Sequence, residues 1–216
     1  MKKLIINADD LGYSSGINRG IIKGFKDGIV TSTSLMVDEK ATEEGVKLAN
    51  ENPDLGLGLH FQINKNDAGE LLNNPAPKAE LIEKAKSEFI RQLQVFEKLT
   101  EKKPDHIDGH WHVHRSPSII LFIKNWCQQN KIPFRDQINF IDSFYGKPDI
   151  QNLLKILENL PEGDSELMCH PGFNTPDLKS AYCEQREIEL KTLMSNEIKN
   201  KIKELNIELI NWKQVN

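Results

Sequence analysis

Short apolar runs alternate with amphipathic stretches from one end of the chain to the other. Short apolar runs bounded by polar residues are typical of buried strands, whereas apolar residues repeated every three or four positions are typical of helices. The predicted strands are Lys3–Ala8, Val30–Val37, Leu55–Phe61, His106–His110, Pro133–Arg135, Glu166–Cys169 and Glu208–Asn211. The predicted helices are Ile17–Lys26, Ala41–Glu51, Lys78–Leu99, Ser118–Asn130, Ile150–Leu160 and Glu184–Leu205, the last interrupted near Ser195.

This alternation indicates an α/β fold with parallel strands and helices on the outside. Seven predicted strands in 216 residues fit a single-domain, seven-stranded β/α barrel that is incompletely closed. A doubly wound open sheet has the same alternation, so the pattern alone leaves that alternative open. No Gly/Ser linker and no internal repeat divides the chain, and we expect one catalytic domain over residues 1–216.

Two polar segments directly follow predicted strands and interrupt the regular pattern. They are Asn64–Pro77 and Gly172–Tyr182. Loops at the carboxyl edge of a β/α scaffold commonly form the walls of a binding site. We therefore expect both segments to border a substrate.

Composition limits the binding partners and the cellular compartment that can be expected for this chain. The formal net charge of −4 argues against a nucleic-acid partner, which usually requires a basic surface. No apolar stretch approaches the ~20 residues of a membrane span, and Leu4–Ile6 is too short for a signal peptide. Three widely spaced cysteines fit free thiols in a reducing cytoplasm. We expect a cytoplasmic protein without membrane partners, and a homodimer stays open.

Two adjacent carboxylates, Asp9 and Asp10, directly follow the apolar run Leu4–Ile6 at a strand-to-helix junction. In parallel α/β folds, functional residues gather at this edge of the sheet. Neighbouring strand residues point to opposite faces. One carboxylate is therefore expected to bind a metal and the other to handle a proton. An isolated Asp pair would more often be solvated or cap a helix, so the rest of the chain decides.

Histidines gather where predicted strands end. Five of the six histidines do so, namely His60, His110, His112, His114 and His170. His110, His112 and His114 alternate, so on a strand they would share one face. On an extended strand His110 and His114 would lie about 13 Å apart at ~3.3 Å per residue, too far to share an ion. We expect His110, nearest the strand end, to be the ligand, with the others lining the cleft.

Two imidazoles and one carboxylate leave coordination positions open on a divalent ion, as a hydrolytic metal site requires. By ligand softness this donor set suits Zn²⁺ or another transition ion. The alternative is a polar His-x-His-x-His segment that binds no metal. The Asp pair and His60 at other strand ends favour the metal site.

Six collinear motifs span nearly the whole chain, and together they resemble the YdjC-like carbohydrate deacetylases. They are Asn7–Gly12, Gly28–Ser34, Gly58–Phe61, His106–His114, Met168–Gly172 and Tyr182–Leu193. The resemblance implies a β/α barrel of the glycoside hydrolase/deacetylase type. It also implies removal of N-acetyl groups from amino sugars such as chito-oligosaccharides, with Mg²⁺ as cofactor. The family's metal ligands fall on Asp10, His60 and His110.

The chain departs from the better-known chitobiose deacetylases in two places. The segment after His60 is shorter, and the stretch between Arg135 and His170 is trimmed. Both segments lie where the sugar is expected, so the resemblance predicts the chemistry better than the identity of the substrate.

The mechanism that follows uses water activated by the metal ion, which also polarises the acetamide carbonyl. Asp9 is the expected general base. Arg135 is expected to orient Asp9, with an ordinary surface ion pair as the alternative. His170 is the expected general acid, because an imidazole with a pKa near neutrality suits proton donation to the leaving amine.

The remaining predicted site residues bind substrate. Trp111 is expected to stack on a sugar ring, with core packing as the alternative. His112 and His114 are expected to line the cleft. Arg186 is expected to contact a substrate group or to brace Asp9, with a solvated helix position as the alternative. For Asp108 we expect structural hydrogen bonding.

Two other functions remain to be compared with deacetylation. A metal-dependent phosphoesterase or other amidohydrolase could use the same ligands, although two-metal sites of that kind need more carboxylates than this chain places at strand ends. A non-catalytic sugar-binding protein could retain the fold. The presence of both Asp9 and His170 argues against it.

Overall fold

The computed structural model describes residues 1–178 and 180–215. Its strands are β1 (Lys2–Leu11), β2 (Ser32–Leu35), β3 (Gly56–Phe61), β4 (Ile107–Gly109), β5 (Asn139–Ile141), β6 (Gly163–Cys169) and β7 (Glu208–Leu209). Its α-helices are α1 (Ser15–Asp27), α2 (Thr42–Asn50), α3 (Lys65–Asn73), α4 (Ala79–Thr100), α5 (Ile120–Asn130), α6 (Ile150–Glu158), α7 (Glu184–Leu193) and α8 (Asn196–Glu204). Short 3₁₀ turns cover His110–Arg115, Arg135–Gln137 and Trp212–Gln214.

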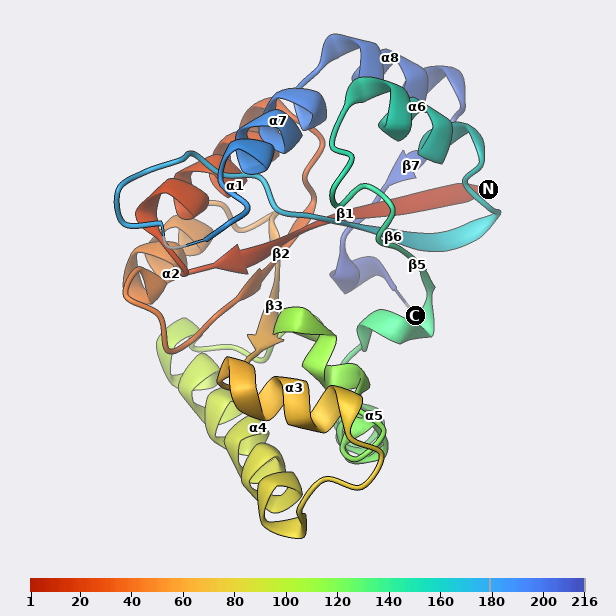
Figure 1. The fold of residues 1–216 in the computed structure, drawn as a ribbon. Coiled ribbons are helices and arrows are strands. Elements are labelled where there is room, and N and C mark those ends of the chain that lie inside the picture. The colour runs from red at the N-terminus through yellow and green to blue at the C-terminus, as the bar shows by residue number, and fades with distance from the viewer. Residues whose placement is uncertain (179, 216) are drawn as a thin grey trace.

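The strands form one parallel sheet in the order β4-β3-β2-β1-β6-β5, and β7 pairs with the start of β1. Figure 1 shows α1, α2 and α7 on one side of the curled sheet and α3, α4 and α5 beyond β3. An isolated parallel bridge between Ile107 and Phe134 extends the curl past β4. The sheet is therefore a half-barrel of parallel strands. The predicted β/α barrel class is confirmed, in an open form.

Strand β1 lies at the centre because it pairs with β2, β6 and β7. Every residue from Leu4 to Leu11 is buried, as expected for a strand covered on both faces. The helices begin at the caps that the sequence offers. Ser14, Asp149 and Ser195 each accept a backbone N–H at the start of α1, α6 and α8. The predicted break near Ser195 is thus confirmed.

Some predicted elements were wrong because tertiary contacts outweigh local pattern. Within the predicted loop Asn64–Pro77, residues Lys65–Asn73 form α3, which is capped by Asn64. The predicted strand Pro133–Arg135 is reduced to the single bridge at Phe134. Strand β5 was not predicted; its three residues pair with β6 without a strong apolar run of their own.

The segment with alternating histidines is also not a strand throughout. Strand β4 ends at Gly109, and His110–Arg115 turn as a 3₁₀ helix. Trp111 and His112 have φ angles of 50° and 58°, an uncommon conformation for residues with side chains. This turn buries Val113 and His114 at the end of the sheet. The expectation that three histidines share one strand face was therefore wrong.

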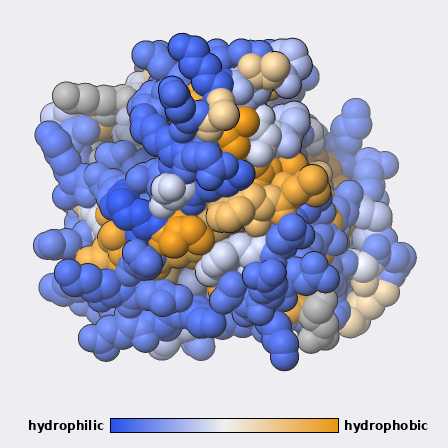
Figure 2. Space-filling view, turned by 90° about the horizontal axis from the view of Figure 1, so that it is seen from below, coloured by the Kyte–Doolittle hydropathy of each residue, from blue (hydrophilic) through white to orange (hydrophobic). Residues whose placement is uncertain are grey.

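One face of the molecule is mainly hydrophilic. Seen from below, it is blue over most of its area and crossed by a band of hydrophobic residues (Figure 2). Among the described residues, no helix has the length and apolar character needed to cross a bilayer.

Candidate metal centre and active site

A β-bulge near the end of β1 brings the two aspartates into the barrel mouth. The register with β2 shifts between Ala8 and Leu11, and Asp10 has a φ of 75°. Gly12 follows with a φ of 95°, and a Cβ there would lie 2.7 Å from the carbonyl oxygen of Met36. The simple strand alternation expected for the pair does not hold here. Both carboxylates reach the neighbourhood of His60, each in a different group of ligands.

The imidazole of His60 is fixed by its neighbour on the next strand. His60 and Asp108 lie side by side in the β3–β4 register, and His60 Nδ1 lies 2.8 Å from Asp108 Oδ1. Burial alone would raise the pKa of Asp108, but Arg135 and His60 hold it well below its usual value. An ionised carboxylate only accepts hydrogen bonds, so Nδ1 donates and Nε2 faces the cleft.

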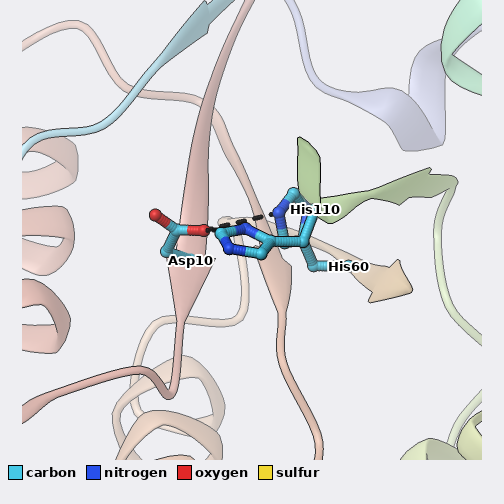
Figure 3. A group of neighbouring side chains, drawn as sticks. All are labelled: Asp10, His60 and His110. Atoms are coloured by element: carbon cyan, nitrogen blue, oxygen red, sulfur yellow. Dashed lines mark ion pairs between the residues drawn. The ribbon is translucent and has the colours of Figure 1, made fainter. Parts of the chain in front are cut away.

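Asp10, His60 and His110 converge at the end of the sheet (Figure 3). Asp10 Oδ1 lies 3.4 Å from His60 Nε2 and 3.2 Å from His110 Nδ1. The same buried Oδ1 has no hydrogen-bond partner among the described residues. Ligand atoms around one ion with bonds of about 2.1 Å lie roughly 3.0–3.4 Å apart. The three donors therefore fit a single divalent cation.

Charge at Asp10 is balanced by Arg186 on α7. Arg186 Nη2 lies 2.6 Å from Asp10 Oδ2, the oxygen that faces away from the histidines. Burial alone would raise the pKa of Asp10, but Arg186, His110 and His60 hold it well below the usual value. The expectation that Arg186 braces Asp9 was wrong, because α7 aims its guanidinium at Asp10.

Asp9 is held by Arg135 in a bidentate pair. The Nη1–Oδ2 and Nη2–Oδ1 distances are 3.0 and 2.6 Å. Asn7 also donates to Asp9 Oδ1 at 2.8 Å. Burial alone would raise the pKa of Asp9, but Arg135 and His60 together lower it below its usual value. Arg135 is fully buried, which excludes the alternative of a surface ion pair.

Arg135 also contacts two further buried acidic side chains that the sequence interpretation did not assign to the site. Its Nη2 lies 2.6 Å from Asp108 Oδ2, and the guanidinium contacts both oxygens of Glu166 at 3.0 and 3.1 Å. Burial raises the pKa of Glu166 to about 8 in spite of this cation. The Arg135 guanidinium thus links acidic side chains from three strands, β1, β4 and β6.

His170, at the end of β6, lies in the same cleft. Its ring Nδ1 is buried without a hydrogen-bond partner among the described residues. Its backbone N–H donates to Glu189 on α7. Burial lowers the pKa of His170 to about 4 although Asp10 and Asp9 oppose this shift. The predicted pKa near neutrality was therefore wrong, and the resting imidazole is neutral at pH 7.

The cleft above these residues has a volume of about 720 Å³. Candidate metal ligands, candidate acid–base residues and aromatic side chains line it. Asp9, Asp10, His60, Trp111, His112, Tyr145, His170, Tyr182 and Arg186 are among the lining residues. The Trp111 side chain is 45% exposed, so it is not a core residue. His114 is fully buried against Phe134 and does not line this cleft.

Several residues of the site were missed from the sequence. Asp108 was predicted only to make structural hydrogen bonds; its contact with His60 confirms that prediction, whereas its place beside a predicted metal ligand was missed. Glu166, Glu189 and Tyr145 gave no signal, since an isolated acidic or aromatic residue is common on strands, helices and loops.

Comparison with known proteins places the chain in a family. A family model described as YdjC-like protein matches residues 3–204. The chain belongs to the YdjC-like family. A relative from Clostridium beijerinckii named carbohydrate deacetylase is 37% identical, covering 99% of this chain and 100% of the relative. A relative from Proteus mirabilis named chitooligosaccharide deacetylase is 34% identical, covering 95% and 96% of the two chains.

Solved structures agree with the fold. A crystal structure from Enterococcus faecalis V583, described as a candidate cellobiose-phosphate cleavage protein, superposes with a TM-score of 0.85. It is 27% identical, and the match covers 98% of both chains. A family 4 carbohydrate esterase from Streptomyces lividans superposes with a TM-score of 0.63 at 11% identity, covering 96% and 91%. The second likeness concerns the fold alone. The family assignment from the sequence motifs is thus confirmed.

Proposed function

We propose that this YdjC-like chain is a single-domain, metal-dependent hydrolase that removes N-acetyl groups from acetylated amino sugars such as chito-oligosaccharides. The observation that carries the proposal is the convergence of Asp10, His60 and His110 beside the Asp9–Arg135 pair in one cleft. The names of the relatives supply the acetylated-sugar substrate class.

Asp10, His60 and His110 would hold the ion. When bound, a divalent cation supplies Lewis-acid chemistry, polarising the acetamide carbonyl and lowering the pKa of water. The resemblance to the family points to Mg²⁺, whereas two imidazoles and one carboxylate favour Zn²⁺ or another transition ion. Binding of Mg²⁺, Mn²⁺ and Zn²⁺ to the same chain decides between them.

Asp9 is assigned the role of general base. The carboxylate lines the cleft, and Arg135 keeps it ionised and fixed in orientation. An ionised carboxylate next to the attacking water accepts its proton as the carbon–oxygen bond forms. Arg135 is fully buried and does not line the cleft, so we assign it a positioning role.

His170 is assigned the role of general acid, which donates a proton to the leaving amine. The imidazole is neutral at rest, so it takes up a proton from solvent in the cleft before it can donate one, and the proton that Asp9 accepts from the attacking water returns to solvent. The nearby carboxylates of Asp10 and Asp9 favour the charged form that such a gain produces. Breaking the carbon–nitrogen bond then delivers this proton to the amine nitrogen.

Substrate contacts are assigned to the exposed cleft residues. Trp111 offers an aromatic surface for a sugar ring, and His112 offers a partly buried imidazole beside it. Arg186 also lines the cleft, and its contact with Asp10 assigns it to supporting the ion ligand. His114 is fully buried outside the cleft, so it is not assigned a substrate contact.

The alternative of a two-metal phosphoesterase is less well supported, because a buried arginine lies at the position of the second metal. A second group of possible ligands exists, Asp9, His60 and Asp108. Arg135 Nη2 already lies 2.6 Å from both Asp9 and Asp108, so a protein cation neutralises that position. Only one set of ligands is therefore free to receive an ion among the described residues.

Acetate release tests the proposal. The purified protein is loaded with Mg²⁺, Mn²⁺ or Zn²⁺ and incubated with N-acetylglucosamine and its oligomers, with and without chelator. We expect acetate release that the chelator abolishes and that added metal restores. If no acetylated amino sugar releases acetate while the metal is demonstrably bound, the deacetylase proposal is wrong. A cytoplasmic location and a homodimer stay predictions from the sequence.

A further inference from the structure

Tyr145 is an exposed aromatic residue inside the cleft. It lies between β5 and α6, and its side chain is 51% exposed. It lines the same cleft as Asp9, Asp10 and His170. A large aromatic ring that is half exposed beside candidate catalytic groups is available to contact a ligand, because half of its surface is not packed against the protein.

The Tyr145 ring is held from behind rather than left free. It stacks on Tyr182 with a centroid distance of 4.6 Å and an interplanar angle of 24°. The Tyr182 hydroxyl donates to Glu189 at 2.8 Å and accepts the Gly146 N–H at 3.1 Å. Tyr182 is therefore tied both to α7 and to the residue that follows Tyr145.

Glu189 links this aromatic pair to His170. One of its oxygens accepts the Tyr182 hydroxyl, and the other accepts the backbone N–H of His170. The side chain of Glu189 is fully buried, so these hydrogen bonds are shielded from water. The orientation of the Tyr145 ring and the position of His170 are thus set by one carboxylate.

The position of Tyr145 matches one part of the substrate. Its ring centroid lies 5.2 Å from that of His170, the residue assigned to the leaving amine. In an N-acetylated sugar the leaving nitrogen is bonded directly to the sugar ring. A nitrogen within reach of His170 therefore brings its own ring close to Tyr145. Trp111, in contrast, lies beside the metal ligand His110, with ring centroids 4.3 Å apart.

We propose that Tyr145 is the aromatic platform for the sugar ring whose amide is cleaved, and that Tyr182 and Glu189 hold this platform in place. This inference rests on the proposed deacetylase function and adds a specificity-determining residue to it. The apolar face of a pyranose packs on an aromatic ring, and such contacts contribute to binding without taking part in the bond change.

Kinetics with two acetyl donors test the platform. The donors are an N-acetylglucosamine oligomer and p-nitrophenyl acetate, which carries an acetyl group but no sugar ring. Tyr145→Ala should raise KM for the oligomer about 3–10-fold with kcat nearly retained, in line with an aromatic contact of roughly 0.5–1.5 kcal/mol. The preference for the oligomer over p-nitrophenyl acetate should fall by a similar factor.

Three further variants and one control variant separate a platform from a structural role. Tyr145→Phe and Tyr145→Trp keep a ring and should retain the KM of the wild type. Tyr182→Phe removes only the hydroxyl that contacts Glu189 and should give a KM between those of wild type and Tyr145→Ala. Leu121→Ala, a 70% exposed residue outside the cleft, should change neither KM nor the preference.

Two kinetic results would overturn the inference: equal losses on both acetyl donors, or a loss in Tyr145→Phe as large as in Tyr145→Ala. Calorimetric binding of the oligomer keeps this test separate from the proposed function. If the wild type releases no acetate but binds the oligomer, and Tyr145→Ala weakens binding, the function is wrong and the platform stands. If the wild type neither binds nor cleaves any acetylated amino sugar, both proposals are wrong.

Discussion

His60 donates from Nδ1 to Asp108 at 2.8 Å, which leaves its Nε2 only 3.4 Å from Asp10. Burial alone would lower the pKa of His60, but Asp108 and Asp10 raise it to about 10 in the metal-free chain. A cation would have to displace the proton from Nε2, while Asp108 continues to hold the other nitrogen. Metal binding should therefore release a proton and depend on pH.

Substitution of Asp108 by Asn should weaken metal binding without removing a ligand. Carboxylates that orient a ligand histidine typically contribute about 10–100-fold to metal affinity. We expect a loss in this range for Asp108→Asn and loss of measurable binding for His60→Ala, both by titration calorimetry. Asp27→Asn, on the surface and paired with Lys23, is the matched control. Unchanged affinity in Asp108→Asn would contradict the orienting role.

The two aspartates of β1 should separate in function. Asp9→Asn should reduce turnover by about 10²–10⁴-fold and keep the ion, because the proton acceptor is lost but the ligand set is intact. Asp10→Asn should lose the ion. Metal content after gel filtration and acetate release are measured on the same samples. Loss of metal from Asp9→Asn would show that the roles are reversed.

Removal of Arg135 should destabilise the fold as well as the site. Its guanidinium is fully buried and contacts three carboxylates, so Arg135→Met leaves buried charges without a partner. Breaking such a buried pair typically costs about 3–5 kcal/mol of the free energy of unfolding. Urea denaturation followed by circular dichroism measures this.

Arg91 provides the control for Arg135. It also contacts two carboxylates, Asp38 and Glu88, but its side chain is 44% exposed. Surface ion pairs contribute about 0–1 kcal/mol, so Arg91→Met should change stability little. Equal effects of the two substitutions would mean that burial does not determine how much these ion pairs contribute to the free energy of unfolding.

Glu166 should make stability depend on pH. Burial raises its pKa to about 8 from the usual 4.5, so between these values the folded chain holds a proton that the unfolded chain has released. The contribution of this group to stability therefore falls as pH rises through this window, by up to about 1.4 kcal/mol per pH unit. Glu166→Gln should flatten that slope in denaturation curves recorded from pH 5 to 8. Parallel slopes in wild type and variant would contradict the raised pKa.

The sequence by itself determined the alternation of strands and helices, the Asp9–Asp10 pair and the set of histidines at strand ends. These follow from local pattern, because hydrophobic periodicity and helix caps act between residues close in the chain. The motifs also sufficed to predict the YdjC-like family. The sequence also predicts Asp10, His60 and His110 as metal ligands, and the structure brings these three side chains together.

Only the tertiary structure decided the partners of these residues. The bulge at Asp10 and the turn at Trp111 redirect side chains that regular strands would have placed elsewhere. Arg135, Glu166 and Asp108 form one charge network because side chains from β1, β4 and β6 converge on Arg135 inside the half-barrel, across sequence separations that local pattern does not describe. Burial lowers the pKa of His170, and the arrangement of the loops leaves Tyr145 exposed in the cleft. Desolvation and long-range pairing depend on the folded environment, so the sequence pattern could name the reacting groups but not their charge states.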